Sequence, residues 1–375
     1  MVKSLTSARR LERCLRGEPI DRVPIWMLYN PIYQENPWYP NYLEAPSYAP
    51  VVQRVMQDAD LFQRHWFSPG IFYSDPACAP KISKIWREMG SRLNATTIQT
   101  PKGLLTAYTR RTENGVEHKA LITKLDDLDK VLSIPDRPFH PDLGEFRRYR
   151  SDLGERALMM VNLCDPMAML YFHCDPEPML LWIATERARV TCFLDIMFER
   201  LMEHLQYLLE QGIGPAFFIV GSEFASPPMV SPRMFRELIL RYDKQIIELI
   251  HRYDGLAIVH HHGPARKILK DILEMQPDGI QPLESPPVGD TPLVEAKQVL
   301  GERICLIGNI QYDTLINAGP ERVAEETHAI IETWKPGGRF VLAPTAGPYQ
   351  DTLSPTAVTN HLQFLRLGRE LGQYA

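Results

Sequence analysis

The chain has 375 residues, of which 45% are hydrophobic and 23% are charged, so it carries enough apolar material for a large folded core. Its formal net charge of -5, with acidic and basic residues interspersed, excludes the basic stripe that a nucleic-acid-binding surface requires. Six cysteines without a C-x-x-C pair, an N-terminus without an apolar signal segment, and no apolar run near roughly 18 residues predict a cytoplasmic protein without membrane association.

Short apolar runs alternate with longer amphipathic segments along the chain, which is the pattern of repeated β-α units. Most of these runs are apolar on both faces, as parallel strands covered by helices must be. The expected strands are VPIWML (23–28), ALMMVNL (157–163), AFFIVG (216–221), LAIVH (256–260), GIQPL (279–283), RICLIG (303–308) and RFVLAP (339–344).

Segments with apolar residues every three or four positions lie between and after these strands and predict helices. They cover residues 185–212, 231–255, 264–279, 290–301, 319–338 and 354–371. This order predicts an α/β fold, a (β/α)8 or TIM barrel, built by residues 1–375 as a single domain. The early strands of the barrel are harder to place than the later ones.

One segment, residues 95–125, breaks this order because its apolar and polar residues alternate with a period of two. Its Asn114-Gly115 pair is a typical turn of a β-hairpin. We therefore expect an antiparallel hairpin inserted near the barrel mouth. The charged, proline-rich stretch 126–155 after it predicts short helices and loops.

Three consecutive histidines end one of the expected strands. Alternation along a strand places His260 and His262 on one face and His261 on the other. Glu284 ends the next strand, so its carboxylate should lie beside the two imidazoles at the carboxyl edge of the barrel, where active sites lie. Two histidines and one carboxylate suit a catalytic Zn²⁺, or Fe²⁺. The alternative is a polar cluster without metal, with Glu284 paired to Arg303.

Other polar and aromatic residues stand at the expected strand ends. Glu223 could be a general acid or base, a substrate contact or an ion-pair partner, and Tyr312 could donate a proton or hydrogen bond. The alternatives for the rest are core or rim packing and capped turns. The candidates for substrate binding are Trp26, Tyr29, Asn30, Asn162, Asp165, Asn309 and Gln311.

Several separated segments resemble the uroporphyrinogen decarboxylase-like superfamily, which includes zinc-dependent methyltransferases acting on corrinoids. The opening RRLERCLRGEPIDRVPIWML is similar to the family's first helix and strand. HHHG stands where the methyltransferases have His-x-Cys-Gly. LIGNIQYDTLINAGPERV and TLSPTAVTNHL resemble the family's later Gly-Asn strand end and its C-terminal turn and helix.

Two departures from the family pattern shape the expected function. True uroporphyrinogen decarboxylases carry Arg-Gln-Ala-Gly-Arg after the first strand to bind the substrate's carboxylates, and this chain has YNPIY there, so porphyrinogen decarboxylation is not expected. The methyltransferases hold zinc through His-x-Cys and a later cysteine. Here His262 replaces the first cysteine, and LAPTAGPY lacks the second.

The related cobalamin-independent methionine synthases add a glutamate ligand one strand after His-x-Cys, and the resemblance therefore implies His260, His262 and Glu284 as metal ligands. Without thiolates the metal is better suited to polarising an oxygen than to activating a thiol. The resemblance implies a zinc-type demethylase that passes a methyl group from a small methoxylated or methylated substrate to a corrinoid, carried by a partner protein. A homodimer is compatible with this reading.

Two other functions stay open on the sequence. The same cation could assist a decarboxylase or hydrolase of a small organic acid. The barrel could also bind a small ligand without catalysis.

Overall fold

The computed structural model of the chain describes residues 4–30, 32–33, 42–67, 72–86, 92–112 and 115–374. It divides into two compact units. The first comprises Met1–Trp66, Asp142–Leu163 and Ile213–Ala375, and the second comprises Phe67–Pro141 and Cys164–Gly212. That the whole chain forms a single domain stays a prediction. None of the described helices is both long and apolar enough to cross a membrane.

The first unit is built on a seven-stranded sheet whose order is β1-β6-β7-β8-β9-β10-β11. The neighbouring strands with a resolved register pair in parallel. Chain order and spatial order agree, as repeated β-α units require. The strands are β1 (Leu61–His65), β6 (Ala157–Cys164), β7 (Ala216–Val220), β8 (Leu256–His261), β9 (Gly279–Pro282), β10 (Cys305–Ile310) and β11 (Phe340–Pro344).

The first expected strand, residues 23–28, contacts both edges of this sheet. Ile25 forms a parallel bridge with Leu342 of β11, and the Trp26 N–H donates to the Leu342 carbonyl over 2.9 Å. On its other side, the Asp60 N–H donates to the Ile25 carbonyl over 2.6 Å, one residue before β1. The segment therefore occupies the position of an eighth strand.

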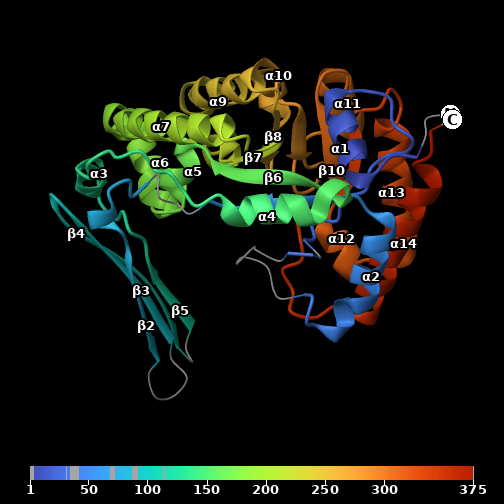
Figure 1. Cartoon of the computed structure of the whole chain (residues 1–375), viewed down its shortest axis with the longest axis horizontal. Helices are drawn as coiled ribbons and strands as arrows, with labels where there is room; N and C mark the ends of the chain where they lie inside the picture. Colours follow the sequence, from blue (N-terminus) through green and yellow to red (C-terminus); the bar gives the residue numbers. More distant parts are fainter. Residues whose placement is uncertain are drawn as a thin grey trace. The chain divides into compact units, whose positions relative to one another are not determined.

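From β7 onward, helices of the first unit separate successive strands, and Figure 1 shows α13 and α14 beside each other at one end of the sheet. The predicted segment 231–255 forms α8 and α9 with a π-helical turn between them. The helices are α1 (Ser7–Arg16), α2 (Ala49–Asp58), α4 (Gly144–Leu153), α8 (Pro232–Phe235), α9 (Arg241–Arg252), α10 (Leu269–Met275), α11 (Leu293–Leu300), α12 (Tyr312–Asn317), α13 (Pro320–Trp334) and α14 (Pro355–Leu371).

The predicted strands from residue 157 onward are confirmed within about two residues at either end, but β1 was missed. Its sequence, LFQRH, contains three consecutive polar residues and has no apolar run. All five of its residues are nevertheless buried. A strand whose polar end faces the inside of a sheet carries no hydrophobic signal of its own.

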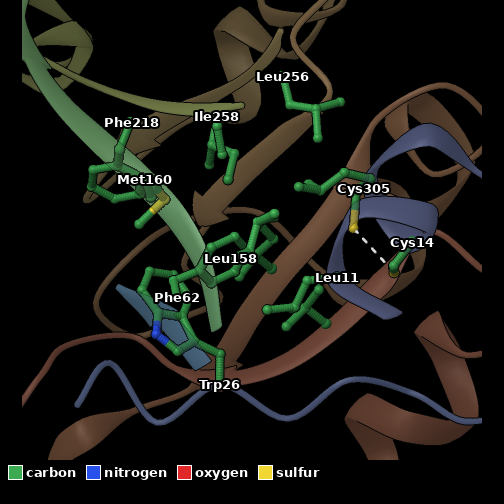
Figure 2. Packing of buried hydrophobic residues seen from close by; sticks show 14 of the residues in the cluster. Leu11, Cys14, Trp26, Phe62, Leu158, Met160, Phe218, Leu256, Ile258 and Cys305 are labelled. Carbon is green, nitrogen blue, oxygen red and sulfur yellow. Dashed lines mark hydrogen bonds between the residues drawn. The ribbon is translucent and has the colours of Figure 1, made fainter. Parts of the chain in front are cut away.

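A hydrophobic cluster forms the core of the first unit on the inner face of the sheet. Its side chains come from α1, the segment 23–28 and the strands. Figure 2 shows Trp26, Phe62 and Phe218 in this cluster. The Trp26 ring lies edge-on to Phe62, with ring centroids 4.7 Å apart, and to Phe218, 6.3 Å apart. Cys14 of α1 and Cys305 of β10 meet in the same cluster, with their sulfur atoms 3.7 Å apart.

The second unit contains an antiparallel sheet of order β2-β3-β4-β5, drawn in blue and teal in Figure 1. The strands are β2 (Lys81–Trp86), β3 (Arg92–Thr100), β4 (Gly103–Thr112) and β5 (Gly115–Lys119), and the helices are α3 (Asp126–Leu132), α5 (Pro166–Tyr171), α6 (Pro176–Thr185) and α7 (Arg187–Glu210). Asn114 of the predicted turn lies outside the described residues. The place of a hairpin near a barrel mouth stays a prediction.

A buried carboxylate ties the N-terminal elements of the first unit together. Asp60 is 0% exposed and accepts from Arg10 Nη1 over 2.5 Å, from Arg22 Nη1 over 2.6 Å and from the Ile25 N–H over 3.1 Å. Arg10 also forms a two-pronged bond with Asp21, with both distances 2.7 Å. These bonds fix α1 and the segment 23–28 against the start of β1.

We predict that Asp60→Asn lowers the free energy of unfolding by about 3 to 5 kcal/mol, because it leaves the buried Arg10 and Arg22 without their shared counter-charge. Urea denaturation measures this loss. Glu370→Gln, which removes an exposed ion pair with Arg366 on α14, is the control and should change stability by less than about 0.5 kcal/mol. Equal effects from the two variants would contradict the role of Asp60.

A second prediction concerns acid stability through Asp21. Burial alone would raise the pKa of this carboxyl, but its bonds from Arg10 and from the Leu5 N–H lower the pKa from 3.8 to about 2. A lowered pKa stabilises the fold fully above pH 4 and loses that stabilisation as the pH falls toward 2. The stability difference between wild type and Asp21→Asn should therefore shrink over this window in urea titrations. A difference that does not vary with pH would contradict this assignment.

Candidate active site

The inner face of the sheet changes from apolar to polar at the carboxyl ends of its strands. Side chains two positions apart on a strand share a face. Five polar residues follow an apolar core residue by two positions, so they lie one step above the hydrophobic cluster: Arg64 after Phe62, Asn162 after Met160, His260 after Ile258, Asn309 after Ile307 and Thr345 after Ala343. They surround the place where a parallel α/β sheet binds its substrate.

His260 is held in one tautomer by Gln281 on the next strand. Its Nδ1 lies 3.0 Å from the Gln281 backbone oxygen and 2.7 Å from Gln281 Oε1. A carbonyl oxygen can only accept, so Nδ1 carries the proton and the lone pair is on Nε2. Gln281 Nε2 in turn donates to the Thr345 carbonyl over 3.3 Å, which keeps Oε1 turned toward His260. This arrangement is typical of a histidine that offers Nε2 to a metal.

Glu223 faces this lone pair from the short helical turn after β7. Its Oε1 lies 4.0 Å from His260 Nε2, and its Oε2 is buried without a hydrogen-bond partner in the described part of the chain. Burial raises the pKa of Glu223 to about 7. Burial, together with the nearby His262 and Arg64, holds the pKa of His260 well below its usual range. A neutral imidazole and a carboxylate are both acceptors, so this pair needs a proton or a cation between them.

His262 and Glu284 continue the row on its other side. The rings of His260 and His262 are 4.6 Å apart and perpendicular, and His262 Nδ1 lies 3.4 Å from Glu284 Oε2. Burial alone would raise the pKa of Glu284, but its bonds to His262 and to the Gly263 N–H, the latter 2.7 Å long, lower it. Glu284 therefore stays an anion beside the half-exposed His262.

The backbone around Glu284 is in conformations that L-residues rarely adopt. Leu283 has a φ of +48° and turns the chain so that the next residue reaches the His262 loop. Gly263 has a φ of +82° and offers its N–H to Glu284. Such conformations cluster at functional sites, where the surrounding fold stabilises them.

His261 points to the opposite side, as alternation predicts. It is 0% exposed, and its Nδ1 lies 2.9 Å from Ser222 Oγ. The same hydroxyl donates to the His260 carbonyl over 2.8 Å, so it accepts from His261. Burial lowers the pKa of His261 to about 4 and keeps the ring neutral. His261 therefore joins β8 to the turn that carries Glu223.

A chain of hydrogen bonds connects His260 to the residues after β10. Thr345 accepts from Gln281 through its carbonyl, and its hydroxyl lies 3.3 Å from Gln311 Oε1 and accepts from the Tyr312 N–H over 3.2 Å. Gln311 and Tyr312 are thus positioned relative to His260 by Thr345, the residue directly after β11.

Tyr29 and Tyr312 come together in a second, buried cluster. Tyr29 stacks on Tyr42 with centroids 4.8 Å apart, and the rings of Tyr29 and Tyr312 lie 6.5 and 5.8 Å from His361. Burial raises the pKa of both tyrosines and keeps their hydroxyls protonated. Burial also lowers the pKa of His361 to about 4.

The remaining predicted residues occupy distinct environments. Trp26 is 0% exposed within the hydrophobic cluster, and the Asn30 N–H donates to the Tyr42 hydroxyl. Asn309 Nδ2 donates to the Leu283 carbonyl and to Ser285 Oγ, so it supports the loop of Glu284. Asp165, in the second unit, caps α5 by accepting from the Ala168 N–H over 2.6 Å.

Asn162 is hydrogen-bonded to Arg64, a residue that the sequence did not identify as a candidate. Its Oδ1 accepts from Arg64 Nε over 2.9 Å, and the Arg64 Cζ atom lies 4.7 Å from the centroid of Phe218. Arg64 and Gln281 were both missed. Arg64 was missed because its strand, LFQRH, has no apolar run and was not predicted. Gln281 was missed because a glutamine inside a short strand carries no sequence signal for the histidine that it orients.

Glu223, His260, His262 and Glu284 form the candidate metal site. In the described ranges, no three His, Cys, Asp or Glu side chains are already close enough together to hold an ion. The row Glu223, His260, His262 and Glu284 nevertheless supplies two neighbouring imidazoles flanked by two carboxylates, with the His260 lone pair fixed toward Glu223. Nitrogen and oxygen donors of this kind suit Zn²⁺ or Fe²⁺, so the residues fit such an ion chemically.

Comparisons with known proteins give a family and a fold. The family described as uroporphyrinogen decarboxylase (URO-D) matches residues 105–362, well over half of the chain. A solved structure described as a methyltransferase from Methanosarcina mazei is 16% identical and superposes with a TM-score of 0.60 over 98% of this chain and 99% of that chain. At this identity the likeness shows a shared fold.

Two curated relatives share part of the sequence. Both are named methylcobamide:CoM methyltransferase MtaA, one from Methanosarcina barkeri and one from its strain Fusaro / DSM 804. They are 27% and 25% identical over 155 residues, which is 41% of this chain. The chain spans 42% of the length of each relative in these matches.

We predict that Gln281→Met weakens Zn²⁺ binding by roughly 10- to 100-fold, because His260 loses the side-chain acceptor that orients its ring. Competition with a chromophoric chelator measures the affinity. Gln245→Met, at an exposed position on α9, is the matched control and should bind Zn²⁺ as the wild type does. Unchanged affinity in Gln281→Met would contradict the orienting role.

Proposed function

The chain belongs to the uroporphyrinogen decarboxylase (URO-D) family, and we propose that it is a metal-dependent methyltransferase that moves a methyl group from a small methoxylated or methylated substrate to a corrinoid. The names of its two curated relatives support methyl transfer. Because these matches span less than half of each relative, the donor, the acceptor and the partner all belong to the proposal.

The observation that carries the proposal is the row from Glu223 through His260 and His262 to Glu284 at the carboxyl ends of β7, β8 and β9. We take the sheet with the segment 23–28 as a (β/α)8 barrel, which the bonds of Ile25 and Trp26 to its neighbours support. In such a barrel these four side chains line the mouth, where a substrate enters.

In the proposal His260, His262 and Glu284 hold Zn²⁺, or Fe²⁺. When bound, this cation would stabilise negative charge on the oxygen or nitrogen from which the methyl group leaves. Gln281 keeps the His260 Nε2 lone pair turned into the site, and the Gly263 N–H orients the Glu284 carboxylate. Neither residue needs to touch the substrate to do this.

Glu223 is the proposed proton donor. Burial raises the pKa of Glu223 to about 7, which favours the protonated form relative to an exposed carboxyl, so Glu223 can protonate a departing alkoxide or phenoxide. Tyr312 is the second candidate. Its buried phenol stays neutral, and it acts in the proposal as a hydrogen-bond donor rather than as an acid.

The substrate contacts in the proposal come from the polar layer and the tyrosine cluster, with Asn162, Asn309 and Gln311 on one side and Tyr29 and Asn30 on the other. Trp26 and Asp165 were also predicted as substrate contacts; in the structure Trp26 is buried in the hydrophobic cluster and Asp165 caps α5. The methyl acceptor is a corrinoid brought by a partner protein in the cytoplasm, a compartment consistent with six free cysteines. A homodimer is part of the same proposal.

The test uses metal-replete protein with cob(I)alamin and a panel of methoxylated aromatics and methylated amines. We expect the methylcobalamin spectrum with at least one donor. His260→Ala and Glu223→Gln should lower the rate by roughly 100-fold or more, since each removes a group needed at the reacting centre. Gln245→Ala on α9 is the control and should keep the wild-type rate.

Two outcomes would count against the proposal. The first is no methylcobalamin from any donor with folded, metal-replete protein. The second is methyl transfer that persists unchanged in His260→Ala.

A further inference from the structure

A cavity of about 210 Å³ lies in the first unit, at the amino ends of its last three strands. Asp278 lines it directly before β9, Arg303 shortly before β10 and Arg339 directly before β11. The candidate active site lies at the opposite, carboxyl ends of the strands. The cavity is therefore a separate feature, and its side chains take no part in the proposed methyl transfer.

Three arginines line this cavity, and they differ in their partners. Arg16, at the end of α1, binds Asp254 Oδ1 through Nη1 over 2.9 Å, and its Nε lies 3.5 Å from Glu12. Asp254 is itself 88% exposed, so water and salt weaken that pair. Arg339 donates to the carbonyls of Leu15 and Arg16, with both distances 3.0 Å. Its charge thus balances the partial negative charge at the end of α1.

Gly17 gives Arg339 its place at the end of α1. A side-chain carbon on Gly17 would lie 2.3 Å from the Arg339 guanidinium, and the φ of +73° at this position also favours glycine. Arg339 itself has a φ of +51°, a conformation that costs free energy and persists where the surrounding fold fixes it. The guanidinium therefore has a fixed place beside the cavity.

Arg303 has neither kind of partner. Its side chain is exposed and forms no hydrogen bond or ion pair within the ranges that the structure describes. The sequence offered Glu284 as its partner, but that pairing is wrong. Glu284 follows β9 and binds His262 and the Gly263 N–H. Arg303 precedes β10, at the other end of the sheet, so its guanidinium N–H groups are available to a ligand in the cavity.

One carboxylate, Asp278, also lines the cavity. Its Oδ2 accepts from the Ala257 N–H over 2.7 Å and lies 2.9 Å from His251 Nε2. In the described part of the chain it forms no ion pair with the three arginines. Three guanidiniums and one carboxylate leave the lining with an excess of positive charge. A small dianion is the ligand whose charge matches this excess.

We propose that this cavity binds a phosphate dianion, either free phosphate or the phosphate group of a small ester. A phosphate group carries about -1.5 to -2 charges at neutral pH and offers strong acceptor oxygens. Arg303 is the principal ligand, because a guanidinium binds phosphate through two parallel N–H···O bonds. Arg339 and Arg16 add positive charge from the end of α1. The site stands apart from the proposed function and does not depend on it.

The size of the cavity limits the ligand. Its volume of about 210 Å³ is smaller than the roughly 300 to 1,000 Å³ of pockets for drug-sized ligands. Leu273, Pro277 and Ile304 form the apolar part of the lining, beside the charged groups. The cavity therefore suits a phosphate group with no organic part or with a short one.

Isothermal titration calorimetry at constant ionic strength tests the site with inorganic phosphate, methyl phosphate and dimethyl phosphate. At about pH 8 the first two are mainly dianions, whereas dimethyl phosphate carries a single charge. We expect at least one dianion to bind roughly 10-fold or more tightly than dimethyl phosphate, because the second charge interacts with the excess positive charge of the lining.

Arg303→Met should weaken binding of that dianion by roughly 10- to 100-fold, because it removes a charge-assisted pair of hydrogen bonds. Arg303→Lys should keep part of the affinity, since it keeps the charge without the two-pronged geometry. Arg322→Met, which removes an exposed arginine of α13, is the matched control and should bind as the wild type does. Circular dichroism checks that each variant is folded.

The two dianions identify the source of the phosphate group. Tighter binding of methyl phosphate indicates an ester, and equal or tighter binding of inorganic phosphate indicates the free ion; both results support the site. Wild-type protein that binds neither dianion at millimolar concentration overturns the proposal. Equal affinity for dianions and dimethyl phosphate also overturns it, as does unchanged affinity in folded Arg303→Met.

Discussion

The alternation of side chains along parallel strands is the constraint on which both the core and the candidate site depend. Residues at every second position face the inside of the sheet. On four strands, and at Thr345 directly after β11, an apolar inner residue is followed two positions later by a polar one. The transition falls near the carboxyl end of each of these strands, although the paired positions differ in polarity: Arg64 pairs with Met160, Val220 with His260, and Asn309 with Ala343. The fold thus collects single polar residues from distant parts of the chain into one layer.

The hydrophobic cluster and the buried ion pairs of Asp60 both stabilise the region that carries this polar layer. The hydrophobic cluster in Figure 2 fills the space beneath it, and Asp60 anchors the two N-terminal segments that complete this region. A carboxylate with 0% exposure that accepts from two arginines is tolerated only because its charge is matched at short range. The order of the polar layer therefore depends on ion pairs that take no part in the proposed chemistry.

The electrostatics of the site follow from burial and from hydrogen bonds that differ between chemically similar groups. Glu223 and Glu284 are both buried carboxylates. Burial outweighs backbone hydrogen bonds and the nearby His262 and raises the pKa of Glu223 to about 7, whereas bonds to His262 and to the Gly263 N–H lower the pKa of Glu284 despite its burial. Burial keeps His260 neutral, and Gln281 fixes the side on which its lone pair lies. One carboxyl can hold a proton while the other stays charged, which is the division of labour that acid-base catalysis needs.

The sequence by itself determined the order of the strands after residue 157 and of the longer helices between and after them, because each of these strands has its own apolar run and each of these helices its own period. It did not indicate the short helices α5, α6 and α12. It also determined that His260, His262 and Glu284 would be neighbours, since consecutive parallel strands end at the same edge. It did not reveal β1, the orienting role of Gln281 or the place of Arg64 beside Phe218 and His260. These features join residues that are tens or hundreds of positions apart. Only the folded sheet brings them within a few ångströms, and no local pattern of polarity records such a contact.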